Sequence, residues 1–569
     1  MSQSLPLKTT LVGEQPNIAT VQASGESKLS IFGWPYSEGT RILKLPSVDA
    51  FISDPSTVVQ SLNGEFCVIA ESPSVLVIAS DRYVSHPLFY AIQNGEFVYS
   101  FEYSVLWSHL KNKGLLTPDK YSIFEFLKFQ RLFGTKTLDL SSKMLPPASI
   151  LRYDKRSGEV STRDYWTPDF TKRTDSIKSI ASDLAEVTRA SIKSKISGFK
   201  NVGLLLSGGM DSRVVLGGFD QPDILTALTV GSDRNNEVKA AEELASKTRI
   251  SHQFVDRTPS HYSEILSQSV SVGGAMYSFQ HGHFFGLDIP KNIDLLLHGH
   301  GFDYMFQGMY LPSRRRSLLG RKTRVYELST PSSVIDEYFS EAKYQLKGLD
   351  VTSLLSTSEI DKANESARSS INAVLSNVED RVVDPLDAWD YLTVGAPGRH
   401  YTFLNLLSAE SLAPQQTVAW DNAVFDCYFS TPANVRFGTR LLSETIAILN
   451  PALLEVRNAN TNLSPKLGGI QLTLASWRRG ALRRIGMTTA TDPSQDDRSW
   501  PSSAQILDHS DVLIDHAENL SKSESLLSLD LFDPTAIASI VSQFRAGQKQ
   551  LGSAILTLIT LDEFLSTKN

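Results

Sequence analysis

Four short candidate strands in the middle of the chain, most of them apolar, constrain its fold more than any other feature. They are NVGLLL at 201–206, ILTALTV at 224–230, HQFVD at 252–256 and IDLLLHG at 293–299. Runs of this length suit buried parallel strands, and stretches such as EVKAAEELASKT (237–248) between them have helical character. Strands and helices that alternate in this way form a parallel sheet through right-handed crossovers. The sequence therefore predicts a doubly wound, Rossmann-like α/β fold for this part.

Earlier in the chain the pattern is that of short strands. SVLVIASD (74–81) and FVYSFEYS (97–104) are rich in β-forming residues, and Asn94-Gly95 is a strong signal for a two-residue hairpin turn. Residues 27 to about 107 are therefore expected to be mainly strands.

The length of the chain, 569 residues, is too great for one ordinary hydrophobic core. The strand-rich pattern ends near residue 165, and the helix-rich pattern begins soon after it. We expect one domain at residues 1–165 and a second at 175–569, with mostly helical structure beyond about residue 330.

Charge and cysteine content exclude several classes of protein. A formal net charge of -7 gives no electrostatic basis for binding nucleic acid. The only cysteines, Cys67 and Cys427, are too few for a disulfide framework or a CxxC zinc site. No signal-peptide core is visible, no run reaches the roughly 18 apolar residues that span a bilayer, and the apolar segment 553–565 is expected to be a packed helix. We expect a cytoplasmic protein with no nucleic-acid or membrane partner.

The string SGGMDS, residues 207–212, carries the chemistry. It follows the first apolar run and precedes a helical stretch, so its backbone amides converge on one point that favours a phosphate. Ser207 and Ser212 add hydroxyl groups, and Asp211 could hold Mg²⁺ against the phosphates. The Walker A pattern is absent. The alternative interpretation is a tight strand-to-helix turn with a capping residue.

This string resembles the SGGxDS pyrophosphate-binding loop of the asparagine synthetase family. LLLHGHGFDYMFQGMY (295–310) resembles a second element of that family, and places Asp303 at its second magnesium-binding aspartate. Tyr304 and His298 stand where the family usually has Glu and Ser. The resemblance implies that the protein uses ATP and Mg²⁺, with Asp211 and Asp303 as the metal ligands. The residues that it implies for nucleotide binding are Leu206, Ser207, Gly208, Gly209, Met210, Asp211, Ser212, Gly299 and Gly301.

Three further residues are candidates for catalysis by the same resemblance. His300 stands where β-lactam synthetases place a Tyr that acts with a Glu to deprotonate the amine, and Glu410 would be its partner. Lys466, in SPKLG, resembles a lysine that stabilises the acyl-transfer step. The alternatives are a hydrogen-bonded histidine at a strand end, an exposed lysine, and a metal site at His298 and His300 for which no third ligand is evident. Other matches to the family are Arg399, Pro414 and Asp421.

The first domain resembles the C-terminal half of the family's N-terminal nucleophile glutaminase domain, which has an αββα fold. The matches are Gly64, Phe66, Asp81, Arg82, Pro87, Leu88 and Tyr90. Such a glutaminase requires Cys directly after the initiator Met, whereas this chain has Ser2. Cys67 lies within an apolar run and is interpreted as a small buried residue. We therefore expect no glutamine hydrolysis.

Together these features predict an ATP-dependent ligase that adenylates a carboxylate, releases pyrophosphate and passes the acyl group to an amine. Its partners would be small-molecule or peptide substrates, with a homodimer or a pathway-partner protein possible. The nearest subtypes are β-lactam synthetases and lasso peptide macrolactam cyclases, and the setting would be natural-product or polysaccharide biosynthesis. Alternatives are adenylation of a nucleic acid and an inactive scaffold or regulatory protein.

Two basic stretches lie close in sequence to the predicted site. They are the arginine-rich segments 314–324 and 478–484. They are interpreted either as solvated faces or as docking sites for an anionic substrate.

Overall fold

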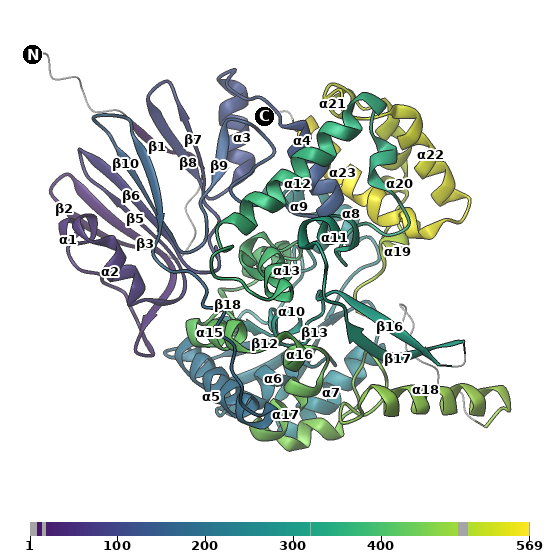
Figure 1. Ribbon diagram of the computed structural model, residues 1–569. Coiled ribbons are helices and arrows are strands. Elements are labelled where there is room, and N and C mark those ends of the chain that lie inside the picture. The colour runs from purple at the N-terminus through teal and green to yellow at the C-terminus, as the bar shows by residue number, and fades with distance from the viewer. Residues whose placement is uncertain (1–7, 14–18, 319, 488–498, 568–569) are drawn as a thin grey trace, which may run out of the picture.

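The computed structural model describes residues 8–13, 19–318, 320–487 and 499–567. Its first part contains two β-sheets that face each other (Figure 1). The larger sheet is antiparallel, with the order β11-β10-β6-β5-β3-β2 and with β4 paired to β3. Its strands are β2 (Ala19–Ser24), β3 (Ser27–Ser37), β4 (Thr40–Arg41), β5 (Asn63–Glu71), β6 (Val75–Ser80), β10 (Ser149–Asp154) and β11 (Val160–Asp164). The smaller sheet, in the order β1-β8-β7-β9, consists of β1 (Thr9–Leu11), β7 (Phe89–Gln93), β8 (Glu96–Ser100) and β9 (Ser142–Met144). Strands therefore begin before residue 27, where the sequence pattern placed the first one.

Alternation along the strands explains why helices cover both outer faces of this sandwich. In β5, Val68 faces one way and packs with Phe51 of α1 (Val48–Ser53) and Val59 of α2 (Pro55–Gln60). Its neighbours Cys67 and Ile69 face the other way and fill the space between the two sheets. The far face of the smaller sheet packs on α3 (Tyr103–Asn112). The predicted αββα fold is confirmed, and Cys67 is the buried apolar residue that the sequence indicates.

The second part is built on a five-stranded sheet with the order β14-β13-β12-β15-β18, and every pairing in it is parallel. Its strands are β12 (Val202–Leu205), β13 (Leu225–Gly231), β14 (Ser251–Asp256), β15 (Leu295–His298) and β18 (Gln415–Thr417). The four strands expected from the apolar runs are confirmed. The fifth strand, β18, was missed because its three residues, QQT, are polar.

Helices flank this sheet and fill the rest of the chain (Figure 1). Those nearest the sheet are α5 (Ile177–Ile196), α6 (Asp211–Gly218), α7 (Asn236–Thr248), α10 (Phe302–Phe306), α14 (Leu404–Glu410), α15 (Asn422–Ser430), α16 (Ala433–Arg436) and α17 (Arg440–Leu449). Helices α8 (His261–Glu264) and α9 (Leu266–Gly273) lie farther from it (Figure 1), and α9 packs on α3, α14 and α23 (Gly552–Ser566). The remainder are α4 (Lys120–Phe129), α11 (Val334–Glu341), α12 (Ile360–Ser376), α13 (Pro385–Val394), α19 (Ser503–Asp508), α20 (Asp511–Asn519), α21 (Glu524–Leu527) and α22 (Pro534–Arg545). The helical character expected beyond residue 330 is confirmed.

The two parts share one hydrophobic core. Tyr103 and Trp107 of α3 contact Phe564 of the C-terminal helix α23, which is packed as expected. The change from strands to helices falls between Asp164, where β11 ends, and Ile177, where α5 begins. The domain limits themselves stay a prediction, because the core continues across that point.

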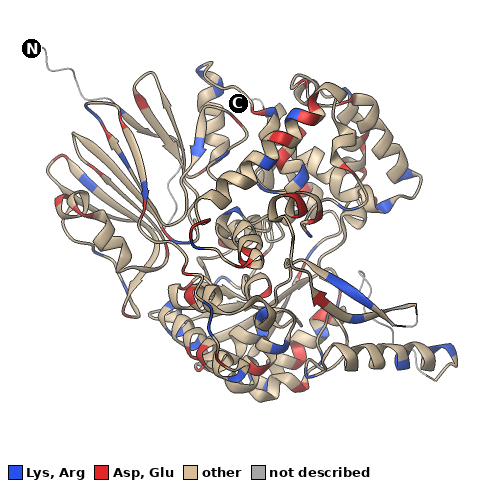
Figure 2. Cartoon of the chain, in the orientation of Figure 1, with Lys and Arg blue, Asp and Glu red and all other residues tan. Residues whose placement is uncertain are grey.

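The arginine-rich stretches form an arm that projects from the body (Figures 1 and 2). Strands β16 (Ser313–Leu318) and β17 (Arg321–Leu328) form an antiparallel hairpin. Helix α18 (Gly469–Arg484) packs against β17. The side chains of Arg314 and Arg316 are exposed, as a solvated face would require.

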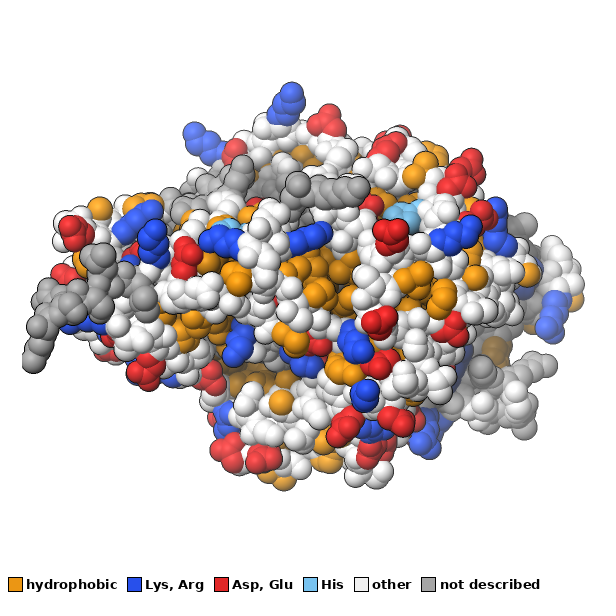
Figure 3. Space-filling view, turned by 90° about the horizontal axis from the view of Figure 1, so that it is seen from above, with side chains coloured by type: hydrophobic (Ala, Val, Ile, Leu, Met, Phe, Trp, Pro, Cys, Tyr) orange, Lys and Arg blue, Asp and Glu red, His pale blue; other side chains and the backbone are white. Residues whose placement is uncertain are grey.

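Charges of both signs are interspersed with apolar side chains on the face seen in Figure 3. Within the described ranges, no helix has both the length and the apolar character needed to cross a membrane.

Candidate active site

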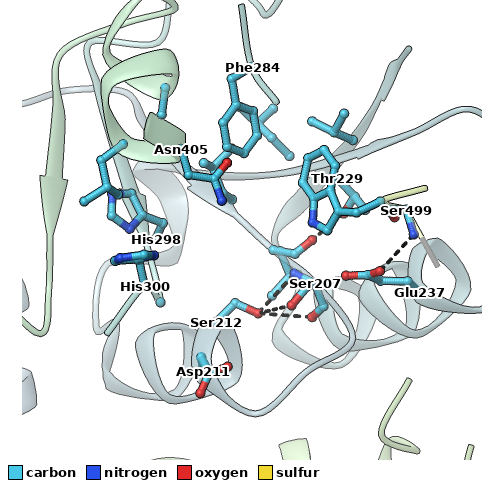
Figure 4. A pocket seen from close by; sticks show the side chains of 18 of the residues that line it. Ser207, Asp211, Ser212, Thr229, Glu237, Phe284, His298, His300, Asn405 and Ser499 are labelled. Atoms are coloured by element: carbon cyan, nitrogen blue, oxygen red, sulfur yellow. Dashed lines mark hydrogen bonds between the residues drawn. The ribbon is translucent and has the colours of Figure 1, made fainter. Parts of the chain in front are cut away.

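The SGGMDS loop connects the end of β12 to the start of α6, at the centre of the parallel sheet. Its two serines close the turn: the Ser207 backbone N donates to Ser212 Oγ at 3.0 Å, and Ser212 Oγ donates to the Ser207 carbonyl at 3.1 Å (Figure 4). On one side of β12 the chain continues to β13, and on the other side lies β15. Ligands of doubly wound sheets bind in the crevice that opens at such a reversal of strand order.

Glycines allow neighbouring segments to approach this loop closely. A Cβ atom on Gly208 would lie 2.5 Å from the Cβ of Ala459. A Cβ atom on Gly299, just after β15, would lie 2.4 Å from the backbone carbon of Asp211. Gly301 has φ of 100°, a conformation that favours glycine. The loops after β12 and β15 are thus in direct backbone contact.

Arg213 holds the SGGMDS loop in place through hydrogen bonds. The sequence analysis did not identify this residue. Its buried guanidinium donates to the carbonyls of Gly208 (3.1 Å), Leu453 (2.8 Å) and Val456 (2.8 Å). The Arg213 side chain therefore joins the SGGMDS loop to the segment that follows α17.

Asp211 and Asp303 come together in the first turns of α6 and α10. Burial raises the pKa of Asp303 to about 6, and burial together with the charge of Asp303 raises the pKa of Asp211 well above its usual range. Asp211 also accepts a hydrogen bond from Gln307 Nε2 at 2.7 Å. Two buried carboxylates that repel each other fit a bound divalent cation, because the cation would offset both charges. These residues suit Mg²⁺ as the sequence predicts.

A cavity of about 280 Å³ opens beside these residues. Five of the residues predicted to bind nucleotide line it: Leu206, Ser207, Asp211, Ser212 and Gly299. Four others shape the two loops without lining it: Gly208, Gly209, Met210 and Gly301.

The cavity also has walls that the sequence did not reveal, made by Thr229, Phe284, Asn405, Ser499 and Trp500. Glu237, an acidic residue in the first turn of α7, also lines the cavity. Its carboxylate accepts a hydrogen bond from the Ser499 backbone N at 3.1 Å (Figure 4). The side chain of Trp500 stacks on His283, with ring centroids 4.3 Å apart.

His298 and His300 lie across the cavity from Glu237 (Figure 4). Burial lowers the pKa of His298 to about 4 and that of His300 to about 3, so both rings are neutral near pH 7. His298 Nε2 is 2.8 Å from Gln415 Oε1, whereas His300 Nε2 has no hydrogen-bond partner. No group of three or more His, Cys, Asp or Glu side chains suited to a metal occurs among the described residues, so the histidine metal site gains no support.

No hydrogen bond joins His300 to Glu410 among the described residues, and the two side chains line different cavities, so their pairing stays a prediction. Asn405, Leu406 and Ala409 on one side of α14 line the active-site cavity, whereas Leu407 and Glu410 lie on the other side and line a second cavity. Residues 406 and 410 are neighbours at i and i+4, so Glu410 lies near the edge of the face that lines the active-site cavity, on the side toward the second cavity. The strand beside β15 instead presents Gln415, which contacts His298.

Lys466 does not line the cavity either, and its side chain is exposed in the turn before α18. Arg399 and Asp421 make structural contacts. Arg399 donates to the Lys136 carbonyl at 2.9 Å, and Asp421 caps α15 and accepts from Asn63 Nδ2 at 2.8 Å. Tyr304, which replaces the family's Glu, is buried with its hydroxyl 3.4 Å from Trp420 Nε1.

Residues 183–421 match the family model described as asparagine synthase. The chain contains an asparagine synthase domain. That domain includes the SGGMDS loop, Asp303 and β18, whereas Ser499 and Trp500 reach the cavity from outside it.

Curated relatives of the asparagine synthase domain agree with this assignment. Carboxyethyl-arginine beta-lactam-synthase from Streptomyces clavuligerus is 23% identical over 266 residues, which cover 45% of this chain and 49% of that protein. Asparagine synthetase [glutamine-hydrolyzing] 1 from Bacillus subtilis is 22% identical over 262 residues, which cover 43% of this chain and 39% of that protein. The chain thus spans half or less of the length of either relative.

Two solved structures were also found. One is glutamine phosphoribosylpyrophosphate amidotransferase from B. subtilis complexed with ADP and GMP, at 10% identity and a TM-score of 0.16, covering 50% of this chain and 57% of the other. The second is titled as the allosteric regulatory enzyme of purine biosynthesis, at 12% identity and a TM-score of 0.18, covering 57% of this chain and 69% of the other. Scores this low do not bear on the fold of the asparagine synthase domain or of the sandwich before it.

Proposed function

We propose that this protein is an ATP-dependent ligase that activates a carboxylate as its adenylate and transfers the acyl group to an amine. One observation carries the proposal: Asp211 and Asp303 line the same cavity beside the SGGMDS loop of an asparagine synthase domain, close enough for their charges to interact. A structural protein would have no use for two adjacent buried carboxylates, because each raises the cost of ionising the other.

ATP would lie with its phosphates on residues 207–212 and its base toward the apolar end of the cavity. The loop amides would donate to phosphate oxygens, as would the serine hydroxyls after exchanging the hydrogen bonds that close the turn, and Asp211 and Asp303 would hold Mg²⁺. Bound Mg²⁺ would neutralise charge on the triphosphate. The apolar end is lined by Leu205, Leu228, Val230, Phe284 and Trp500, which suit a flat aromatic base.

In the first step an oxygen of the substrate carboxylate attacks the α-phosphorus, and the bond to the pyrophosphate oxygen breaks. In the second step the amine attacks the acyl carbon, loses a proton, and AMP leaves with the bonding electron pair. His300 is neutral and has a free Nε2, so it accepts a hydrogen bond from the amine and orients it. Because its pKa is lowered to about 3, it would be a weak base.

The amine would not come from glutamine hydrolysis. This part of the proposal depends on Ser2, which stands where the nucleophilic Cys is required and lies outside the described residues. Lys466 would serve the transfer step only if its exposed turn moved toward the cavity. A role of Lys466 in acyl transfer therefore requires a conformational change of this turn.

Isotope exchange between ATP and pyrophosphate tests this function. Wild-type protein is incubated with a panel of carboxylates, namely aspartate, β-amino acids, acidic peptides and uronic acids, beside Asp211→Ala. Ser464→Ala, which changes the exposed turn before α18, is the matched control. Exchange that requires one carboxylate and is lost only in Asp211→Ala supports the ligase. Absence of both exchange and Mg²⁺-dependent ATP binding in calorimetry would refute it and favour a scaffold role.

A further inference from the structure

A second cavity, of about 310 Å³, lies between the two parts of the chain. One wall comes from the rim of the smaller sheet and the start of α3, and the other comes from α9 and α14. Its lining residues are Ser85, His86, Pro87, Phe89, Phe101, Glu102, Tyr103, Gln268, Val272, Gly273, Tyr277, Phe285, Leu407, Glu410 and Ser411. We call it the interdomain cavity.

Glu410 brings an uncompensated carboxylate into this cavity. Its side chain is half-buried and has no hydrogen bond or ion pair to any described residue. Burial raises the pKa of Glu410 to about 7, and no neighbouring cation offsets that rise. A second carboxylate, that of Glu102, lies in the same lining.

Nothing in the lining supplies a positive charge. It contains no Lys or Arg, and burial lowers the pKa of its one imidazole, His86, to about 4, so that ring is neutral. Its Nε2 has no hydrogen-bond partner. The described residues also include no group of three or more ligands suited to a metal ion. Among the described residues, the lining thus has two carboxyl groups and no cationic side chain, and it does not suit a metal ion.

Aromatic rings make most of the remaining wall. Phe89, Phe101, Tyr103, Tyr277 and Phe285 line it. The hydroxyl of Tyr103 donates to Asp139 Oδ2 at 2.7 Å, and that of Tyr277 donates to the Gly398 carbonyl at 2.5 Å. Both hydroxyls are therefore engaged away from the cavity, and the aromatic rings that line it supply the kind of surface that attracts cations.

We propose that the interdomain cavity binds an organic ammonium ion, with its charge at Glu410 and its carbon skeleton against the aromatic wall. Carboxylate and aromatic faces together select a cation with an apolar body over a neutral molecule of the same shape. The site is separate from the nucleotide cavity, because α14 stands between them. It does not depend on the ligase function proposed above.

Calorimetry with small cations tests the site directly. The probes are tetramethylammonium, 1,4-diaminobutane and benzylammonium, with benzyl alcohol as the neutral counterpart of the last. At least one cation should bind wild-type protein, and benzylammonium should bind at least tenfold more tightly than benzyl alcohol. Glu410→Gln should weaken cation binding tenfold or more, whereas Glu341→Gln, an exposed glutamate on α11, should leave it unchanged.

Two further variants keep the outcome clear. Gln268→Trp, at the exposed rim of the cavity, should block binding without touching Glu410. Asp211→Ala should bind the cation as wild type does, even if it binds no ATP, so failure of the ligase proposal would not be confused with failure of this one. Equal affinity for the ammonium and the alcohol, unchanged binding in a folded Glu410→Gln, or no binding of any cation would each overturn the proposal.

Two kinds of ligand carry such an ammonium group: the acceptor amine of the ligase reaction and an effector. A labelling experiment distinguishes them. Each amine that binds is prepared in isotopically labelled form. It is then incubated with ATP and with the carboxylate that the exchange experiment has identified. Label in the amide product identifies an acceptor. Altered turnover without incorporation identifies an effector.

Discussion

Glu65 of the first β-sandwich and Lys195 of α5 form a buried ion pair, with Oε1 and Nζ 3.3 Å apart. Glu65 also accepts a hydrogen bond from the Thr417 backbone N at 2.7 Å. The pair therefore joins the sandwich to β18, the strand beside the active-site strand β15. Despite Lys195, burial raises the pKa of Glu65 to about 7.

A raised carboxylate pKa fixes the sign of a pH effect on stability. The folded state retains a proton on Glu65 between the unfolded pKa of about 4.5 and the folded value of about 7. The contribution of Glu65 is complete below pH 4.5, is lost as pH rises from 4.5 to 7, and amounts to about 3 kcal/mol in total. Urea unfolding of wild type and Glu65→Gln from pH 5 to 8 should show a shallower decline in the variant. Parallel pH profiles would contradict this.

Asp303→Asn should separate function from stability. Removing one of two buried, mutually repelling carboxylates should raise the free energy of unfolding of the nucleotide-free protein by about 1 kcal/mol. The same change should abolish Mg²⁺-dependent ATP binding. Thermal unfolding without nucleotide and calorimetry with Mg²⁺ and ATP measure the two effects. A variant that is less stable and still binds ATP would show that Asp303 has a structural role.

The contact between the loops after β12 and β15 can be probed with two glycines. Gly299→Ala places a Cβ 2.4 Å from the backbone of Asp211, so the loops must separate, and we expect a loss of about 2–4 kcal/mol in stability. Gly480→Ala is the control, because a Cβ at this site in α18 meets nothing within 4 Å. It should be neutral or slightly stabilising. Equal effects at both positions would mean that the close approach is not needed.

Trp500 should report on the nucleotide base. Its indole lines the active-site cavity beside Phe284, so ATP should change its fluorescence, and Trp500→Phe should lack that component. Trp500→Ala should weaken ATP binding about tenfold, which corresponds to ~1.4 kcal/mol of lost stacking. Pyrophosphate, which has no base, should bind the variant as it binds wild type. Weakened pyrophosphate binding would instead mean that the whole cavity is disturbed.

The parts of the fold with a strong local pattern were predictable. The apolar runs at β12, β13 and β15 are mostly buried on both faces, so they read as continuous hydrophobic strands, whereas the edge strand β14 is largely exposed and has only a short apolar pair, Phe254 and Val255. β18 gave no such signal, because its glutamines are polar and form hydrogen bonds with residues distant in sequence. Gln415 pairs with His298, and Gln416 pairs with Tyr36.

The candidate site divides in the same way. Residues of the SGGMDS loop and Asp303 lie within recognisable strings, and the structure brings them together. Glu410 also matches a family position, but only the folded chain shows that its side chain lines the second cavity. Trp500 and Ser499 come from a distant segment and carry no motif, so nothing short of the folded chain could place them.

Helix α14 is a thin partition, with the nucleotide cavity on one side and the interdomain cavity on the other. A ligand that displaces it from one side changes the shape available on the other. Thermodynamic reciprocity then requires that ATP alter the affinity for an ammonium ion by the same factor as the ammonium ion alters the affinity for ATP. A single helix of two turns would thus let each cavity sense whether the other is filled.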